Sequence, residues 1–189
     1  MVGRVLLSCG LLLGGPLRVW ASGPTMCGES GTAVAMTMAT TRSVRSRLED
    51  PRLGELLRDG VAGSETLRRL VVALDASDVI VYVSFANNPK VRSYLAHDLV
   101  AAASFRYLHV VIGATLTDRE GIAALAHELQ HAMEVAQSPE VTDSAGITSL
   151  FRRIGYPTLK GAEVRETDAA LRVQQRVKAE LASPGGCRQ

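Results

Sequence analysis

The stretch GIAALAHELQHAMEVAQ, residues 121–137, constrains the fold more than any other part of this chain. Thr117 and Glu120 form a capping-box pattern just before it, so we predict a helix over about residues 118–137 that ends before Ser138 and Pro139. The residues that precede the first histidine are apolar on nearly every side, which is typical of a buried helix. We therefore expect this helix to be buried rather than to be an exposed amphipathic helix.

His127, Glu128 and His131 form the pattern H-E-x-x-H within this helix. Residues i and i+4 share one helical face, so both imidazoles can reach a single cation while Glu128 stands beside them. A carboxylate in that place can take a proton from a water molecule at the metal without being a ligand itself. The pattern predicts one Zn²⁺ site with His127 and His131 as metal ligands and Glu128 as the catalytic base.

A zinc ion with two histidine ligands needs a third protein ligand and an open position for water. We predict a last helix over about residues 163–182, on which Glu166 heads an apolar stripe with Ala170 and Val173. An acid on an inward face is explained by a ligand role, so Glu166 is the favoured third ligand. Glu163 heads a more polar line and is the alternative, and His97 and His109 are the other candidates.

Glu134 shares the helical face of the two histidines. Residues i and i+7 lie about 10.5 Å apart along a straight helix, so one metal cannot easily gather His127, His131 and Glu134 together. Glu134 is expected either to orient a ligand histidine or to be satisfied by solvent or core groups, and it stays an alternative to Glu166 as ligand.

The rest of the chain predicts an α+β fold with a small antiparallel or mixed sheet packed on the H-E-x-x-H helix and the C-terminal helix. Two segments rich in β-branched and aromatic residues are predicted strands, residues 78–85 and 104–115, and the ambiguous stretch 91–103 favours strand. Two helices are predicted near residues 51–60 and 64–75, the second capped by Ser64. Residues 138–162 are predicted to be loop, with one helical turn around ITSLFRRI.

The N-terminal residues 1–21 have the parts of an export signal: a positive start, a short apolar run broken by glycines, and a small-residue site near Ala21. The run is too short for a stable membrane span, so we expect cleavage and a periplasmic or secreted protein, with lipidation at Cys9 as the less favoured alternative. Residues 22–47 read as a flexible linker, 48–183 as the folded domain and 184–189 as a tail. Cys27 and Cys187 are left, and their pairing is open.

The charge balance argues against nucleic acid as a partner. The chain has 21 basic and 19 acidic residues in 189, a net charge of +2, whereas nucleic-acid-binding proteins concentrate Lys and Arg in patches. The 47% hydrophobic fraction is that of a globular protein, and the length suits one domain. Nothing in the pattern predicts an oligomeric state.

HELQH, followed over thirty residues later by the segment with Glu166, resembles the gluzincin branch of zinc metallopeptidases, which takes its third ligand from such a downstream helix. The resemblance covers about residues 78–180 and is to a minimal relative, because no Asn precedes Glu166 and no third His extends the motif. It implies a zincin-like fold over residues 48–183 and a strand, residues 104–115, that runs along the cleft and pairs with an extended substrate.

By this resemblance the chain is a zinc metallopeptidase that hydrolyses a peptide or protein substrate. Glu128 takes a proton from the attacking water, and Tyr156 or His109 is a candidate donor to the oxyanion. The alternative is a non-catalytic, zinc-stabilised binding protein of the cell envelope. A di-iron bundle would need a second Glu-x-x-His pair, which the sequence lacks, and a metal-free interaction protein would leave the buried motif unexplained.

Overall fold

The computed structural model describes residues 47–158 and 161–183 of the chain. The predicted export signal, nearly all of the predicted linker, the tail at 184–189 and the three cysteines lie outside the described residues. The described residues thus cover nearly all of the segment predicted to be the folded domain.

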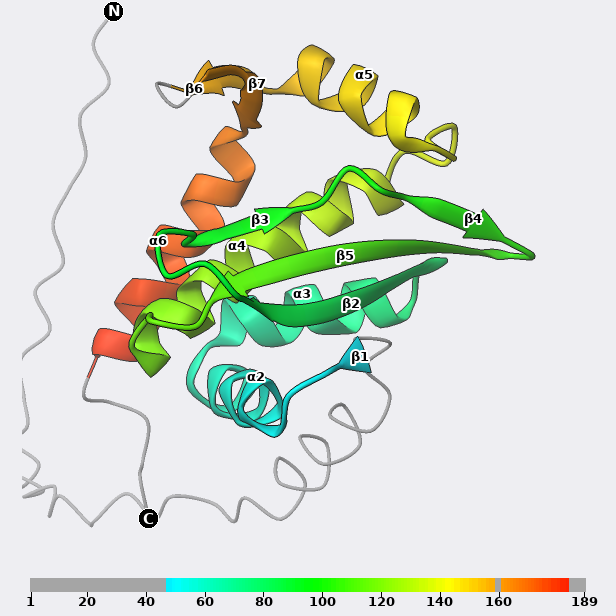
Figure 1. Ribbon diagram of the computed structural model, residues 1–189. Helices are drawn as coiled ribbons and strands as arrows, with labels where there is room; N and C mark the ends of the chain where they lie inside the picture. Colours follow the sequence, from blue (N-terminus) through cyan, green and yellow to red (C-terminus); the bar gives the residue numbers. More distant parts are fainter. Residues whose placement is uncertain (1–46, 159–160, 184–189) are drawn as a thin grey trace, which may run out of the picture. The chain divides into compact units, whose positions relative to one another are not determined.

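A mixed sheet forms one layer of this segment (Figure 1). Its strands are β1 (Arg47–Leu48), β2 (Val79–Ala86), β3 (Ser93–Leu95), β4 (Val100–Ala102) and β5 (Phe105–Gly113). β2 and β5 run parallel at the centre with Tyr82 opposite His109, and β1 extends the sheet beyond β2. β3 and β4 pair antiparallel with the other side of β5. The α+β class and the mixed sheet are confirmed.

The position of β5 corrects one expectation. Residues 104–115 were expected to run along a cleft and to pair with a substrate, yet β5 is hydrogen-bonded to β2 on one side and to β3 and β4 on the other. A strand with two partners has no free edge for a third. On this side of the sheet the outermost strands among the described residues are β3 and β4, beyond which no described strand pairs.

The described residues form five helices: α2 (Pro51–Gly63), α3 (Glu65–Asp75), α4 (Asp118–Ala136), α5 (Ser144–Ile154) and α6 (Asp168–Ala182). The first three confirm predicted helices within a few residues. Ser64 caps α3 through the backbone N–H of Leu67, as predicted. Thr117 and Glu120 make both bonds of the capping box at the start of α4. The local signals in the sequence therefore set these helix starts.

The segment between α4 and α6 differs from the prediction. α5 is a helix of 11 residues rather than a single turn, because Asp143 caps its start and Ile147, Leu150 and Phe151 are buried along one side. A hairpin of β6 (Tyr156–Thr158) and β7 (Gly161–Glu166) follows it. α6 begins at Asp168 after the N-cap Thr167, so Glu166 ends a strand and the prediction that it heads a helical stripe was wrong.

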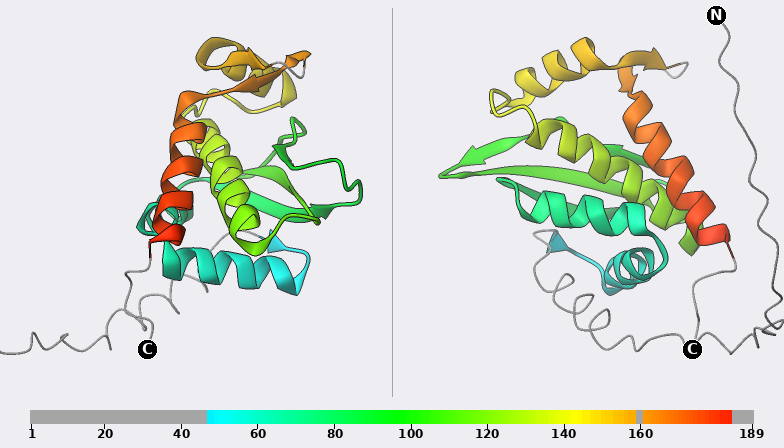
Figure 2. Two further views of the ribbon diagram at one scale, coloured as in Figure 1. Left: turned by 90° about the vertical axis from the view of Figure 1, so that its left-hand side faces the viewer. Right: turned by 180° about the vertical axis from the view of Figure 1, so that it is seen from behind.

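α4 is the central helix of the domain. It packs against β2, β3 and β5 on one side and against α6 on the other, and helices lie on one face of the sheet (Figure 2). Arg106 of β5 is buried and binds the C-terminal end of α4. Its guanidinium pairs with Asp78 and donates to the carbonyls of Val135 at 2.9 Å and Ser138 at 2.8 Å. A cation at a helix C-terminus stabilises the helix and satisfies its last carbonyls. The motif helix is thus fixed at both ends.

Candidate metal centre

α4 brings the three residues of the motif together on its buried side. One ligand atom each of His127, Glu128 and His131 lies within 4.8 Å of the others, and all three side chains are buried. Buried imidazoles and carboxylates are costly unless they have partners. The group could hold a metal ion.

Glu166 comes from β7 to meet both histidines. Its Oε2 lies 3.3 Å from Nε2 of His127, and its Oε1 lies 3.4 Å from Nε2 of His131. Ligand atoms at about 2.0–2.2 Å from a tetrahedral zinc ion lie about 3.4 Å from one another, so these spacings fit a shared zinc ion. The backbone N–H of Thr167 donates to Oε1 of Glu166 at 2.8 Å and helps to orient the carboxylate.

A second set of contacts orients His131 through the ring nitrogen that does not face Glu166. Its Nδ1 lies 2.9 Å from Oε2 of Glu134, and the hydroxyl of Thr167 donates to the other Glu134 oxygen at 2.7 Å. Thr167 also accepts from the backbone N–H of Ala170 as the N-cap of α6. Glu134 therefore contacts a motif histidine on the side away from Glu166, which was one of the two roles expected for it. Through Thr167 it also connects α4 to the start of α6.

His127 lacks such a support. Its Nδ1 is buried and has no hydrogen-bond partner among the described residues. Its ring lies edge-on to that of His131, with 4.9 Å between the ring centroids. The two histidines thus present the same nitrogen to Glu166 but differ in what holds the other nitrogen.

The charges of the site reinforce one another. Burial lowers the pKa of His131, but its hydrogen bonds to Glu134 and Glu166 outweigh this and raise the pKa to about 9. Burial raises the pKa of Glu166, yet the hydrogen bonds to His127 and His131 reverse the shift and hold the pKa well below its usual range. Without a metal, a protonated His131 and an ionised Glu166 stabilise each other.

The pKa of Glu128 is shifted in the opposite direction to that of Glu166. Its burial raises the pKa of the carboxyl above the usual range, against the lowering effects of His131, His127 and a hydrogen bond from Ser93. A carboxylate with a raised pKa is a better proton acceptor near neutral pH than a solvated one. Ser93 lies in β3. Ser93 and Leu95 are two residues apart in this strand, so both side chains point to the α4 side of the sheet.

The remaining histidines do not contact Glu166 in the described structure. His109 bonds Ser84 at 2.8 Å on the sheet face away from α4, so it is wrong as a third ligand and as an oxyanion donor at this site. His97 stacks on Phe151 with ring centroids 5.8 Å apart, and Phe151 lies edge-on to His131. Glu163 lies in β7, and its side chain is outside the described part.

Sequence reasoning missed two residues of the site, Thr167 and Ser93. Thr167 carried a readable signal, because a threonine before Asp168 and a run of helix-forming residues is a typical N-cap. Ser93 carried none, since its contact with Glu128 depends on how β3 packs against α4. Glu166 was predicted as a ligand from a helical pattern, whereas in the structure it lies at the end of strand β7.

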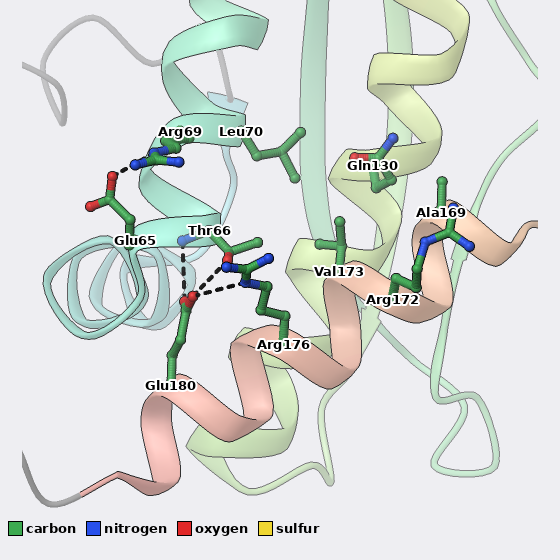
Figure 3. A pocket seen from close by; sticks show the side chains of 10 residues that line it. All are labelled: Glu65, Thr66, Arg69, Leu70, Gln130, Ala169, Arg172, Val173, Arg176 and Glu180. Atoms are coloured by element: carbon green, nitrogen blue, oxygen red, sulfur yellow. Dashed lines mark hydrogen bonds and ion pairs between the residues drawn. The ribbon is translucent and has the colours of Figure 1, made fainter. Parts of the chain in front are cut away.

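A separate groove of about 570 Å³ lies between α3 and α6 (Figure 3). Its ten lining residues are Glu65, Thr66, Arg69, Leu70, Gln130, Ala169, Arg172, Val173, Arg176 and Glu180. Its acids already have partners: Glu65 pairs with Arg69 at 2.6 Å, and Glu180 accepts from the Thr66 hydroxyl at 2.7 Å. Only Gln130 comes from the motif helix, so the groove is not the candidate metal centre.

Comparisons with known proteins add no assignment. No helix in the described residues is long and apolar enough to cross a membrane. No protein-family model, no curated protein and no solved structure matches this chain.

Proposed function

We propose that this chain is a zinc-dependent hydrolase, most simply a metallopeptidase that cleaves peptide bonds. One observation carries the proposal: a carboxylate from a distant strand lies 3.3 and 3.4 Å from the two motif histidines, with Glu128 buried beside them. Two imidazoles and one carboxylate are the ligand set of many catalytic zinc sites, which keep a fourth position open.

His127, His131 and Glu166 would hold the metal. When bound there, zinc would lower the pKa of a water molecule towards about 7 and polarise a substrate carbonyl. Glu134 would keep the ring of His131 oriented through its Nδ1, and Thr167 would keep Glu134 in place. The support for zinc is the donor set and its spacing, since Mg²⁺ and Ca²⁺ prefer oxygen ligands alone.

Glu128 would act as the general base. Its carboxylate would accept a proton from the attacking water and then deliver it to the leaving amine. The raised pKa of Glu128 suits both transfers, and the hydrogen bond from Ser93 holds the carboxylate toward the sheet.

Tyr156 is the candidate donor to the developing oxyanion. It is the cross-strand partner of Glu166 in the β6–β7 hairpin, and directly opposed residues of an antiparallel pair project from the same face. Its side chain is exposed and forms a hydrogen bond with Asp168, which lies two residues after Glu166. Of the two donors considered from the sequence, only Tyr156 is next to the site.

Metal analysis of the purified chain, combined with a hydrolysis assay on a peptide library, tests the proposal. We expect about one zinc per chain, retained in Glu128→Gln without hydrolysis and lost in Glu166→Ala. Glu140→Gln is the matched control, since Glu140 is exposed and pairs with Arg153, and it should change neither.

Absence of zinc in the wild-type chain would contradict the proposal. Zinc in wild type and Glu128→Gln alike, with no hydrolysis of any peptide, would favour the non-catalytic, zinc-stabilised binding protein instead. Two irons per chain would favour a di-iron site.

A further inference from the structure

The second face of the sheet, which points away from α4, is made mainly of apolar and aromatic side chains, some of which are exposed. We call it the open face; it is formed by Ile80, Tyr82 and Ser84 of β2, Tyr94 of β3, Val100 of β4, and Phe105, Tyr107, His109 and Val111 of β5. The register places these side chains together, because paired residues of neighbouring strands share a face. No helix of residues 47–158 and 161–183 lies on this side (Figure 2).

The chemistry of the open face is not that of a surface adapted to water. None of these nine side chains is Asp, Glu, Lys or Arg, and Ser84 and His109 hydrogen-bond each other; the one charged residue in register with them is Arg47 at the β1 edge, opposite Tyr82. Tyr82, Tyr94 and Val100 are 37%, 47% and 58% exposed, whereas Ile80 and Val111 are buried. Exposed apolar residues grouped on one face often mark a surface that contacts another segment or protein.

The strand arrangement leads to the same conclusion. β2 and β5 run parallel through eight paired positions. Strands that are buried on both faces, as in all-parallel sheets, have near-continuous hydrophobic sequences, and VIVYV of β2 and YLHVVI of β5 have this character although the sheet is mixed. Helices cover only one face of this pair.

The size of the open face favours a segment of the same chain over a second copy. β5 has 9 residues, so at about 3.3 Å per residue and about 4.8 Å between three strands the face measures roughly 400 Å². A stable interface between proteins buries about 800 Å² on each partner. A tethered segment needs less area, because its effective concentration is on the order of millimolar.

The described part of the chain begins next to this face. Its first residue, Arg47 of β1, is the direct partner of Tyr82, whose side chain belongs to the open face. Residues 31–41, GTAVAMTMATT, carry no charge and include Val34, Met36 and Met38. Residues 42–46 between them and β1 can span about 17 Å, which exceeds the width of three strands, about 14 Å.

We propose that residues 31–41 of this chain bind the open face and cover its aromatic side chains. Methionines adapt well to irregular aromatic surfaces, and an uncharged segment brings no charge against the apolar and aromatic side chains of β2, β3 and β5. The proposal is independent of the metal centre, which lies on the other side of the sheet.

Photo-cross-linking in the full-length chain tests this. Tyr94 is replaced by p-benzoylphenylalanine, and the cross-linked peptide is identified by mass spectrometry after irradiation. Val72, 52% exposed on α3, receives the same group in the control chain. We expect a product of monomer mass that joins position 94 to a residue within 31–41, about tenfold above the control and unchanged on dilution.

Combining Met36→Asp with Met38→Asp should lower the yield of that product by about tenfold, since burial of a carboxylate against aromatic rings is unfavourable. Both substitutions lie outside the described domain, and its unfolding temperature serves as the check on folding. A product of dimer mass would overturn the proposal in favour of a second copy. A yield at position 94 equal to that at position 72 would overturn it outright.

Discussion

The surroundings of His131 and His127 differ although the two rings face the same carboxylate. His131 is held on both sides, by Glu134 at Nδ1 and by Glu166 near Nε2. His127 lies near Glu166 through Nε2 alone, and its buried Nδ1 has no partner in the described part of the chain. One half of the site is therefore ordered by the protein itself, whereas the other half depends on what occupies the space between the side chains.

This difference has an energetic meaning. Removal of one partner from a buried ion pair leaves a charge uncompensated, which costs far more than the pair contributes. Removal of the His127 ring takes one partner from Glu166 but leaves it paired with His131, so no charge is left without a partner. The two histidines should thus be equally important for metal binding and unequally important for folding.

The strongest effect should appear when His131→Ala is compared with His127→Ala in the presence of a chelator. His131→Ala leaves Glu134 buried with Thr167 as its hydrogen-bond partner, so the free energy of unfolding should fall by about 3 kcal/mol. His127→Ala should cost about 1 kcal/mol, mainly from lost packing. Urea unfolding at pH 7 measures both values. Equal losses would remove the distinction between the two halves.

A smaller effect is expected from Glu134→Gln. The amide can no longer stabilise a positively charged His131 or fix its ring as firmly, so zinc affinity should fall by about 10- to 100-fold. Competition with a chelating dye measures the affinity. Glu140→Gln is the control and should bind zinc as the wild type does; a matching loss there would show that the effect is not specific to His131.

The pH dependence of stability and of zinc affinity should report the protonation of His131. With its pKa raised to about 9, His131 stabilises the metal-free fold fully below its ordinary pKa of 6.5, and this contribution is lost as the pH rises through about 9. Zinc must displace this proton, so its affinity should rise by about tenfold per pH unit towards pH 9. Calorimetry in buffers of different ionisation enthalpy should show about one proton released at pH 7.5. An affinity independent of pH between 7 and 9 would contradict the assignment of that proton.

The weakest effect should be at Thr167. Thr167→Ala removes the N-cap of α6 and the hydroxyl that holds Glu134, so the free energy of unfolding should fall by about 1 kcal/mol and zinc affinity by a few-fold. Thr167→Ser keeps the hydroxyl and should restore both. Thermal unfolding and the dye competition measure the two variants, and a serine variant as weak as the alanine variant would exclude the hydroxyl as the cause.

Local signals in the sequence predicted well the helix that carries the motif and one strand of the central sheet. The capping box at Thr117 and the apolar pattern of residues 121–137 are short-range features, and they set the start and the burial of α4 correctly. The strand at 78–85 was equally readable, because β-branched residues in a row favour extended structure. The placement of His127, Glu128 and His131 on one buried face followed directly.

Longer-range features were beyond such reasoning. Glu166 of the β6–β7 hairpin meets His127 and His131, which lie 39 and 35 residues earlier in the chain, and no local pattern shows that contact. The contacts of Ser93 with Glu128 and of Thr167 with Glu134 join segments that are 35 and 33 residues apart. α5 was underestimated although its signals are local: Asp143 is an N-cap, and Ile147, Leu150 and Phe151 follow one another at helical spacing.

The proposed function depends above all on His127, His131 and Glu166 sharing one zinc ion. A crystal structure of the zinc-loaded chain, with anomalous data collected on both sides of the zinc absorption edge, would show whether they do. We expect a single strong anomalous peak about 2.0–2.2 Å from Nε2 of each histidine and from a carboxylate oxygen of Glu166. A zinc peak bound elsewhere, with Glu166 still hydrogen-bonded to both rings, would contradict the shared site.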